Sequence, residues 1–222
     1  MDWQALGLSV KLSLVTLFFL LPIGIFFGRW LAYRQFLGKS ILQTLLALPL
    51  VLPPTVLGYY LLVIFSPNQG LGLWLNKTFG TTFVFNFEGL VIASIIFNLP
   101  FAIQPMQRAF SSIPRDIREA AACCGMSPAH VLWKIELPLA WPGIISAMVM
   151  CFAHTLGEFG IVLIVGGNIP AETQTIAISI YDRMQAFDNQ SASIMSLSLL
   201  LFSMLTISFT YWLSERSQKK HV

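Results

Sequence analysis

Charged residues are scarce in this chain: Asp, Glu, Lys and Arg together make up 10% of its 222 residues. Hydrophobic residues make up 56%, and the mean hydropathy is +0.73. Soluble globular domains contain about 45–50% apolar residues, so the composition excludes an ordinary soluble domain. Cysteine is also rare, with only Cys123, Cys124 and Cys151, two of them adjacent. This excludes a disulfide framework and favours small buried thiols.

Several catalytic patterns are missing from the sequence as well. It contains no G-x-x-x-x-G-K-[ST] phosphate loop, no H-E-x-x-H metalloprotease pattern and no G-x-S-x-G elbow. His154 and Glu158 form only H-x-x-x-E, without a third metal ligand. An intramembrane metalloenzyme is therefore a remote alternative, and we expect no enzyme activity, no metal and no cofactor.

What the chain has instead is long apolar runs. The five runs are 12–27, 41–65, 89–103, 141–163 and 192–213. The run 141–163 contains His154 and Glu158, and the other four contain no ionisable Asp, Glu, His, Lys or Arg. Each run with its flanks approaches the ~20 residues that span a bilayer as a helix. The runs predict an all-α membrane protein with five transmembrane helices. A further helix expected at about 173–187, with Ile176, Ile180, Met184 and Phe187 on its apolar face, leaves a sixth crossing open.

Lys and Arg are distributed unevenly between the loops. The second and fourth loops contain only Lys77 and Arg183. The first loop, the third loop and the tail contain Arg29, Arg34, Lys39, Arg108, Arg115, Arg118, Lys134, Arg216, Lys219 and Lys220. Because cytoplasmic loops carry the excess of Lys and Arg, we predict the N-terminus outside and the C-terminus in the cytosol. The net charge of +3 then reflects topology and gives no reason to expect nucleic-acid binding.

The third loop contains a polar stretch, EAAACCGMSPAHVLWKIELP, at residues 119–138. Gly125 is suited to end one helix, Ser127 to cap the next, and Pro128 to occupy its first position. The Leu-Pro pair at 137–138 is expected to end that second helix. The pattern predicts a cytosolic helix-turn-helix, which is either a knob that inserts into a partner's groove or a simple connection.

This stretch resembles the signature loop of ABC-importer permeases: Glu-Ala-Ala, three residues, Gly, nine residues, Ile, one residue, Leu-Pro. The matching positions are Glu119, Ala120, Ala121, Gly125, Ile135, Leu137 and Pro138. The resemblance implies one permease domain, 1–222, in the cytoplasmic membrane of a bacterium. It also implies that a coupling loop at about 109–140 docks onto a separate ATP-hydrolysing subunit. A second copy of the chain, as a homodimer, and an external oxyanion-binding protein complete the implied assembly.

Two segments are similar to those of molybdate permeases, LPLVLPPTVLGYYLL at 48–62 and LGEFGIVLIVGGNIPAETQTI at 156–176. The phrase QAFDNQSAS at 185–193 is more similar to the sulfate branch. The resemblance therefore implies molybdate as the substrate, with tungstate and sulfate or thiosulfate as alternatives. The external loops offer no basic funnel and no span carries a deep Lys or Arg, so we expect the external protein to select the anion.

The second and fourth spans also contain the candidate gate residues. Pro53 and Pro54, together with Pro49, interrupt the second span, and Thr55 follows them. Prolines remove backbone hydrogen bonds, so the break predicts either a pathway lining or a structural kink.

Glu158 is unusual because a carboxyl inside a span costs roughly 2.5–3.5 kcal/mol on insertion scales. His154 lies one turn away and can pair with it, and Gly157 and Gly160 permit close helix approach. We expect Glu158 to accept hydrogen bonds near the gate, or to serve as a structural link between helices.

Overall fold

The computed structural model describes residues 1–218, with the side chains of residues 79 and 209–218 outside the description. This part of the chain is helical and contains no strand. The helices are α1 (Trp3–Tyr33), α2 (Lys39–Val51), α3 (Pro54–Phe65), α4 (Gly70–Phe79), α5 (Phe87–Ser111), α6 (Arg115–Cys123), α7 (Pro128–Val131), the π-helix η1 (Leu132–Glu136), α8 (Leu137–Leu156), α9 (Gly160–Gly166), α10 (Ile176–Gln185) and α11 (Asn189–Gln218). The all-α expectation is confirmed.

Four stretches are long and apolar enough to cross a membrane: Trp3–Tyr33, Phe87–Ser111, Pro128–Leu156 and Asn189–Ser208. The pair α2 and α3 passes the same test together, although the two helices are bent by 110° at the break between them. Counting that pair as one broken span gives five, as predicted. The helix expected at 173–187 is α10, and its 10 residues are too few to span a bilayer.

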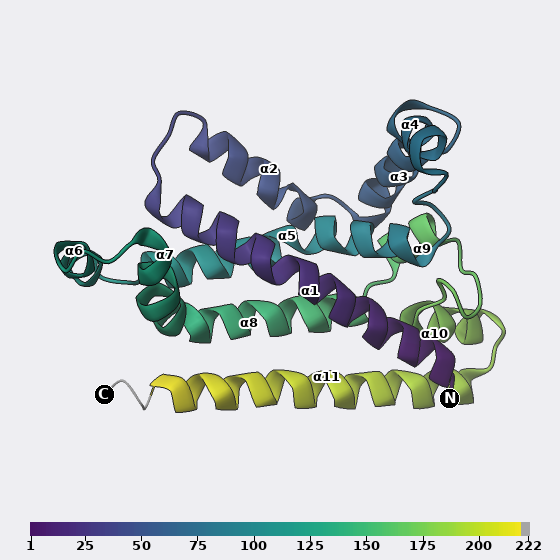
Figure 1. Ribbon diagram of the computed structural model, residues 1–222. Coiled ribbons are helices and arrows are strands. Elements are labelled where there is room, and N and C mark those ends of the chain that lie inside the picture. The colour runs from purple at the N-terminus through teal and green to yellow at the C-terminus, as the bar shows by residue number, and fades with distance from the viewer. Residues whose placement is uncertain (219–222) are drawn as a thin grey trace.

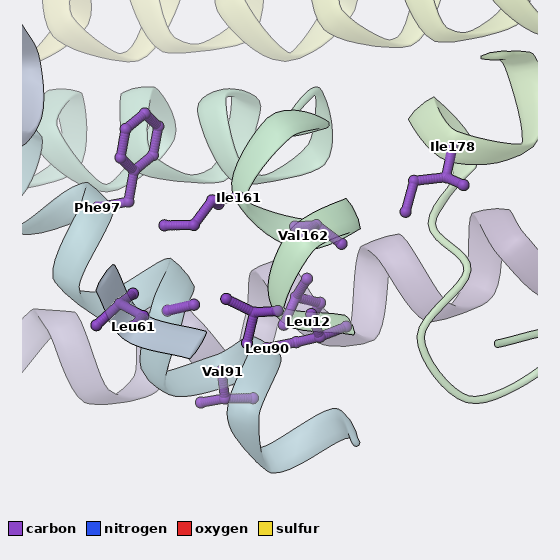
Figure 2. Packing of buried hydrophobic residues seen from close by; sticks show 10 residues of the cluster. Leu12, Leu61, Leu90, Val91, Phe97, Ile161, Val162 and Ile178 are labelled. Atoms are coloured by element: carbon purple, nitrogen blue, oxygen red, sulfur yellow. The ribbon is translucent and has the colours of Figure 1, made fainter. Parts of the chain in front are cut away.

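Helix α5 is the centre of the bundle and packs against α1 and α8 along its length. Figure 1 shows α1, α5 and α8 side by side, with α11 along the outer face of α8. Buried side chains from α1, α3, α5, α9 and α10 form the largest apolar cluster (Figure 2), which includes Leu12, Leu61, Leu90, Val91, Phe97, Ile161, Val162 and Ile178. The cluster fixes the short helices α3 and α9 against the long ones.

The two ends of the molecule differ in charge. The loop from α1 to α2 and the helices α6 and α7 lie at one end, and the N-terminus, α4 and α10 lie at the other (Figure 1). Most of the predicted cytosolic Lys and Arg residues therefore share one end; Lys219 and Lys220 lie outside the described residues. Arg29 was expected in the first loop, but α1 continues past it to Tyr33. The arrangement is compatible with the predicted sidedness, which stays a prediction.

The Leu-Pro pair was expected to end the second helix of the third loop. This expectation is wrong, because the helix continues through the pair to Leu156. The turn before Pro138 is the π-helix η1, in which Leu137 N–H donates to the Leu132 carbonyl five residues back. A proline normally clashes with the carbonyl four residues before it. A π-turn repositions these carbonyls, so Pro138 is accommodated at the start of α8.

The prediction of small buried thiols is wrong for two of the three cysteines. Cys123, the last residue of α6, and Cys124, its C-cap, are exposed, and only Cys151 is buried. On α10, Met184 is 53% exposed and Phe187, just beyond the helix, is 89% exposed. The face of α10 that packs inward consists of Ile176, Ile178 and Ser179. The predicted apolar face is thus buried at Ile176 and exposed at its far end, at Met184 and Phe187.

Candidate coupling loop and gate

The third loop forms the predicted helix-turn-helix, and its turn depends on Gly125. That residue has φ = +73°, a left-handed conformation that favours glycine. Its N–H donates to the Ala122 carbonyl at 2.9 Å, and Met126 N–H donates to the Ala121 carbonyl at 3.1 Å. Ser127 then caps α7 by accepting the His130 N–H at 3.3 Å. The turn is therefore closed by its own hydrogen bonds.

The signature residues of this loop are divided between an exposed and a packed set. Glu119, Ala120 and Gly125 are exposed on the α6 side of the turn. Ala121 is 5% exposed and is the buried residue of α6. Ile135 and Leu137 are partly buried, and Pro138 is exposed. The loop thus presents an exposed helical surface that carries the carboxylates of Asp116 and Glu119.

A buried charge cluster attaches the loop to α1, and sequence reasoning missed it. Glu136 is completely buried and accepts a hydrogen bond from Arg29 Nε at 2.5 Å and one from Arg118 Nε at 3.0 Å. The Arg118 guanidinium lies 3.5 Å from the centre of the Tyr33 ring, and the Tyr33 hydroxyl donates to the Phe110 carbonyl at 3.0 Å. One carboxylate therefore connects α1, α6 and the π-turn that leads into α8.

The candidate gate residues of the second and fourth spans meet in space. Helix α3 begins after Pro53 and packs along α9. A Cβ on Gly160 would lie 3.0 Å from Pro54 Cβ and 3.7 Å from Thr55 Cγ2, so this glycine permits the close approach of the two helices. Pro53, Thr55 and Gly157 are exposed in the single chain. The break in α2–α3 and the break between α8 and α9 therefore form one junction with an open side.

Glu158 lies in the break between α8 and α9 and is 6% exposed. Its Oε1 accepts the Ile161 N–H at 3.5 Å, and its Oε2 lies 4.0 Å from His154 Nδ1. His154 has a shorter contact with Asn98, at 3.2 Å between Nδ1 and Oδ1, and its ring lies against Phe97 and Phe101. The predicted proximity of His154 and Glu158 is present, but Asn98 is the closer partner of the histidine.

Asn98 is the second residue that the sequence did not single out. It is fully buried in α5, and its Nδ2 donates to Thr155 Oγ1 at 3.0 Å and to the Ser94 carbonyl at 2.8 Å. Thr155 donates in turn to the Cys151 carbonyl at 2.8 Å. This network joins α5 to the end of α8 immediately before the break. Its signal in the sequence is an isolated amide within the apolar run 89–103.

Helix α8 connects the two candidate sites. It has 20 residues, which corresponds to about 30 Å at 1.5 Å per residue. Its first turn follows the Glu136 cluster, and its last turn carries His154 and Thr155. A movement of the loop can therefore reach the break through one continuous helix.

The loop, the broken spans and the fold define a class of transport protein. The family described as "Binding-protein-dependent transport system inner membrane component" matches residues 21–219, and the chain belongs to this family. It is therefore a multi-pass membrane transport subunit of the ABC-importer permease type and not an enzyme, as the sequence predicted.

Particular relatives are similar over nearly the whole chain. The molybdenum transport system permease protein ModB of Azotobacter vinelandii is 41% identical over 95% of this chain and 93% of the relative. A probable sulfate transport system permease protein, cysT of Chlorokybus atmophyticus, is 30% identical over 96% of this chain and 78% of the relative. Among solved structures, a bacterial alginate ABC transporter in complex with an alginate pentasaccharide-bound periplasmic protein has a TM-score of 0.78 at 19% identity, covering 96% of this chain and 78% of that one.

Proposed function

We propose that this chain is the permease subunit of a molybdate importer in the cytoplasmic membrane of a bacterium. The assignment of molybdate as the substrate rests on the similarity to the Azotobacter molybdenum permease, at 41% identity over nearly the full length of both chains. The sulfate permease is less similar and matches over a smaller share of its length. Sulfate, thiosulfate and tungstate remain the alternatives, since all are oxyanions of related shape.

The lining of the junction suits a permease that does not itself select the anion. The gate residues include no Lys or Arg, and the ionisable groups there are Glu158 and His154. A bare carboxylate does not attract molybdate. The proposal therefore assigns anion selection to an external binding protein and gives Glu158 the role of capping α9 at the gate.

The open side of the junction supports a homodimer. Val51 at the end of α2 is 81% exposed, and Tyr59 and Tyr60 of α3 are 58% and 57% exposed. These large apolar residues flank the exposed Pro53 and Thr55. A second copy placed on this face would cover them and enclose the pathway at a two-fold axis.

The coupling step follows from the geometry of the third loop. The exposed side of α6, with Glu119, would dock onto a separate ATPase subunit, one per permease chain. ATP-driven movement of that subunit would displace the loop, and α8 would carry the displacement to the break at Gly157. The two states of the gate are then selected by differential binding of ATP and of the external protein.

The test is the ATPase activity of the reconstituted complex in the presence of binding protein loaded with each anion. Molybdate- and tungstate-loaded protein should stimulate hydrolysis most strongly. Stimulation by sulfate-loaded protein alone would show that the substrate assignment is wrong, although the proposed transport function would still hold. An activity that is lost on chelation and needs no ATPase would favour the remote metalloenzyme alternative.

A further inference from the structure

A cavity of about 710 Å³ lies between the end of α1 and the third loop. Its walls include three arginines, Arg29, Arg34 and Arg118, together with Trp30 and Trp133. Part of its lining comes from α6, α7 and η1, which lie at the end of the molecule where the predicted cytosolic loops gather. The gate residues do not line this cavity, and the coupling step proposed above assigns no ligand to it.

The charges around the cavity do not balance. Glu136 is the carboxylate that pairs with Arg29 and Arg118, and it occupies only the Nε of each. Among the side chains that the structure describes, those of residues 1–78 and 80–208, the terminal nitrogens of both guanidinium groups have no hydrogen-bond partner, and Arg34 makes no side-chain hydrogen bond or ion pair. Three positive charges against one negative charge leave a surplus of two. Guanidinium forks of this kind bind phosphate oxygens in pairs.

The rest of the lining matches the membrane interface. Pro22, Ile25 and Phe26 extend the wall of the cavity along α1, away from the arginines. Phe26 and Trp133 are 64% and 69% exposed, and tryptophans concentrate at the level of the lipid headgroups. The cavity therefore combines cationic, aromatic and apolar walls, which suit the phosphate, glycerol and acyl-chain regions of a phospholipid.

We propose that this cavity binds the phosphate headgroup of an anionic membrane phospholipid. The shared chemistry is that of a phosphate-type oxyanion, and the apolar wall favours the lipid over free phosphate as its source. Basic pockets between helices at the cytoplasmic surface are suited to anionic headgroups. The inference rests on the proposed function in one respect: the predicted orientation of the permease in the membrane, which places the cavity in the cytoplasmic leaflet.

Bound lipid would act on the coupling machinery through the same arginines. A headgroup on the terminal nitrogens of Arg29 and Arg118 would hold these side chains in the orientation in which their Nε atoms contact Glu136. The lipid would then tighten the attachment of α6 to α1 without contacting the gate. Anionic lipid is thus expected to influence how well loop movement is transmitted.

The test uses the purified permease–ATPase complex and native mass spectrometry with phosphatidylglycerol, phosphatidylcholine and inorganic phosphate as probes. Arg34→Gln is the informative variant, because Arg34 takes no part in the Glu136 pairs. Arg108→Gln is the matched control: it removes one exposed charge from the last turn of α5, outside the cavity lining. One basic residue near anionic lipid contributes about 1 kcal/mol, which is about fivefold in affinity.

We expect saturable binding of phosphatidylglycerol, about fivefold weaker in Arg34→Gln and unchanged in Arg108→Gln, with phosphatidylcholine binding weakly. Equal binding of the two lipids would overturn the proposal, as would equal weakening in both variants, which indicates general surface charge. Displacement of the lipid by inorganic phosphate at similar concentration would identify a free-anion site instead. The binding assay contains no transport step, so its failure is distinguishable from an error in the transported substrate.

Discussion

Replacing Glu136 by glutamine should uncouple ATP hydrolysis from transport. The carboxylate is fully buried and accepts two charge-assisted hydrogen bonds, from Arg29 and Arg118. The amide has nearly the same shape, but it can accept from only one arginine and turns its own N–H groups toward the other.

The size of the effect follows from the exposure of the partners. A hydrogen bond to a charged group contributes about 1.5–3 kcal/mol, but the two arginine side chains are 30% and 31% exposed. Solvent screening reduces each contribution toward about 1 kcal/mol. We therefore expect Glu136→Gln to weaken the attachment of the loop by about 2 kcal/mol, or about 30-fold in the attached population.

The assay is the ratio of molybdate uptake to ATP hydrolysis in proteoliposomes. Glu136→Gln should lower this ratio several-fold while the complex still assembles. Arg118→Gln should lower it less, and the double variant should lose less than the sum of the two single losses, because both act on one interaction. A normal ratio in Glu136→Gln, or strictly additive losses, would refute the idea that the cluster transmits loop movement.

Substitutions at three further positions, two of them with a control variant elsewhere, test the loop and the gate. Glu158→Gln keeps an acceptor for the Ile161 N–H and should retain more uptake than Glu158→Ala, which loses about 1 kcal/mol of capping; equal uptake would make the carboxyl a bystander. Gly125→Val should lose ATPase co-purification and transport, because a β-branched residue resists φ = +73°. Gly80→Val, at φ = +65° in the opposite end of the molecule, should strain its turn similarly yet keep the ATPase bound; loss in both, or in neither, would contradict the docking role. Gly160→Ala should reduce uptake at least several-fold by separating α9 from α3, whereas Gly7→Ala, whose Cβ would meet nothing within 4 Å, should transport normally.

The sequence was sufficient to predict the elements that depend on local chemistry. The broken second span follows from Pro53 and Pro54, which cannot continue a helix ladder. The helix-turn-helix of the third loop follows from Gly125, Ser127 and Pro128, which act on backbone groups within a few residues of themselves. These features need no knowledge of tertiary contacts.

The features that depend on distant partners were not predictable in the same way. Glu136 and Arg29 are 107 positions apart, and their ion pair exists because α1 packs beside the third loop. Sequence position alone placed Arg29 in a loop, since the charge suggested an end to the span. The π-turn before Pro138 is equally non-local, because it reconciles a proline with a helix that must continue into α8.

Asn98 illustrates the same limit at the gate. Its amide forms hydrogen bonds with Thr155, which is 57 positions away, and with His154, the residue before Thr155. From the sequence, His154 and Glu158 were natural partners, being one turn apart. The structure instead gives the histidine a shorter contact across the bundle to α5, because the helix ends at Leu156 and turns the carboxylate toward α9.

The central claim is that this chain forms the path for molybdate, and uptake of radioactive molybdate by proteoliposomes tests it most directly. The vesicles should contain the permease, its ATPase and the external binding protein, with ATP on the ATPase side. We predict ATP-dependent accumulation of molybdate that excess tungstate inhibits and excess sulfate does not. Accumulation of sulfate but not molybdate under these conditions would contradict the account.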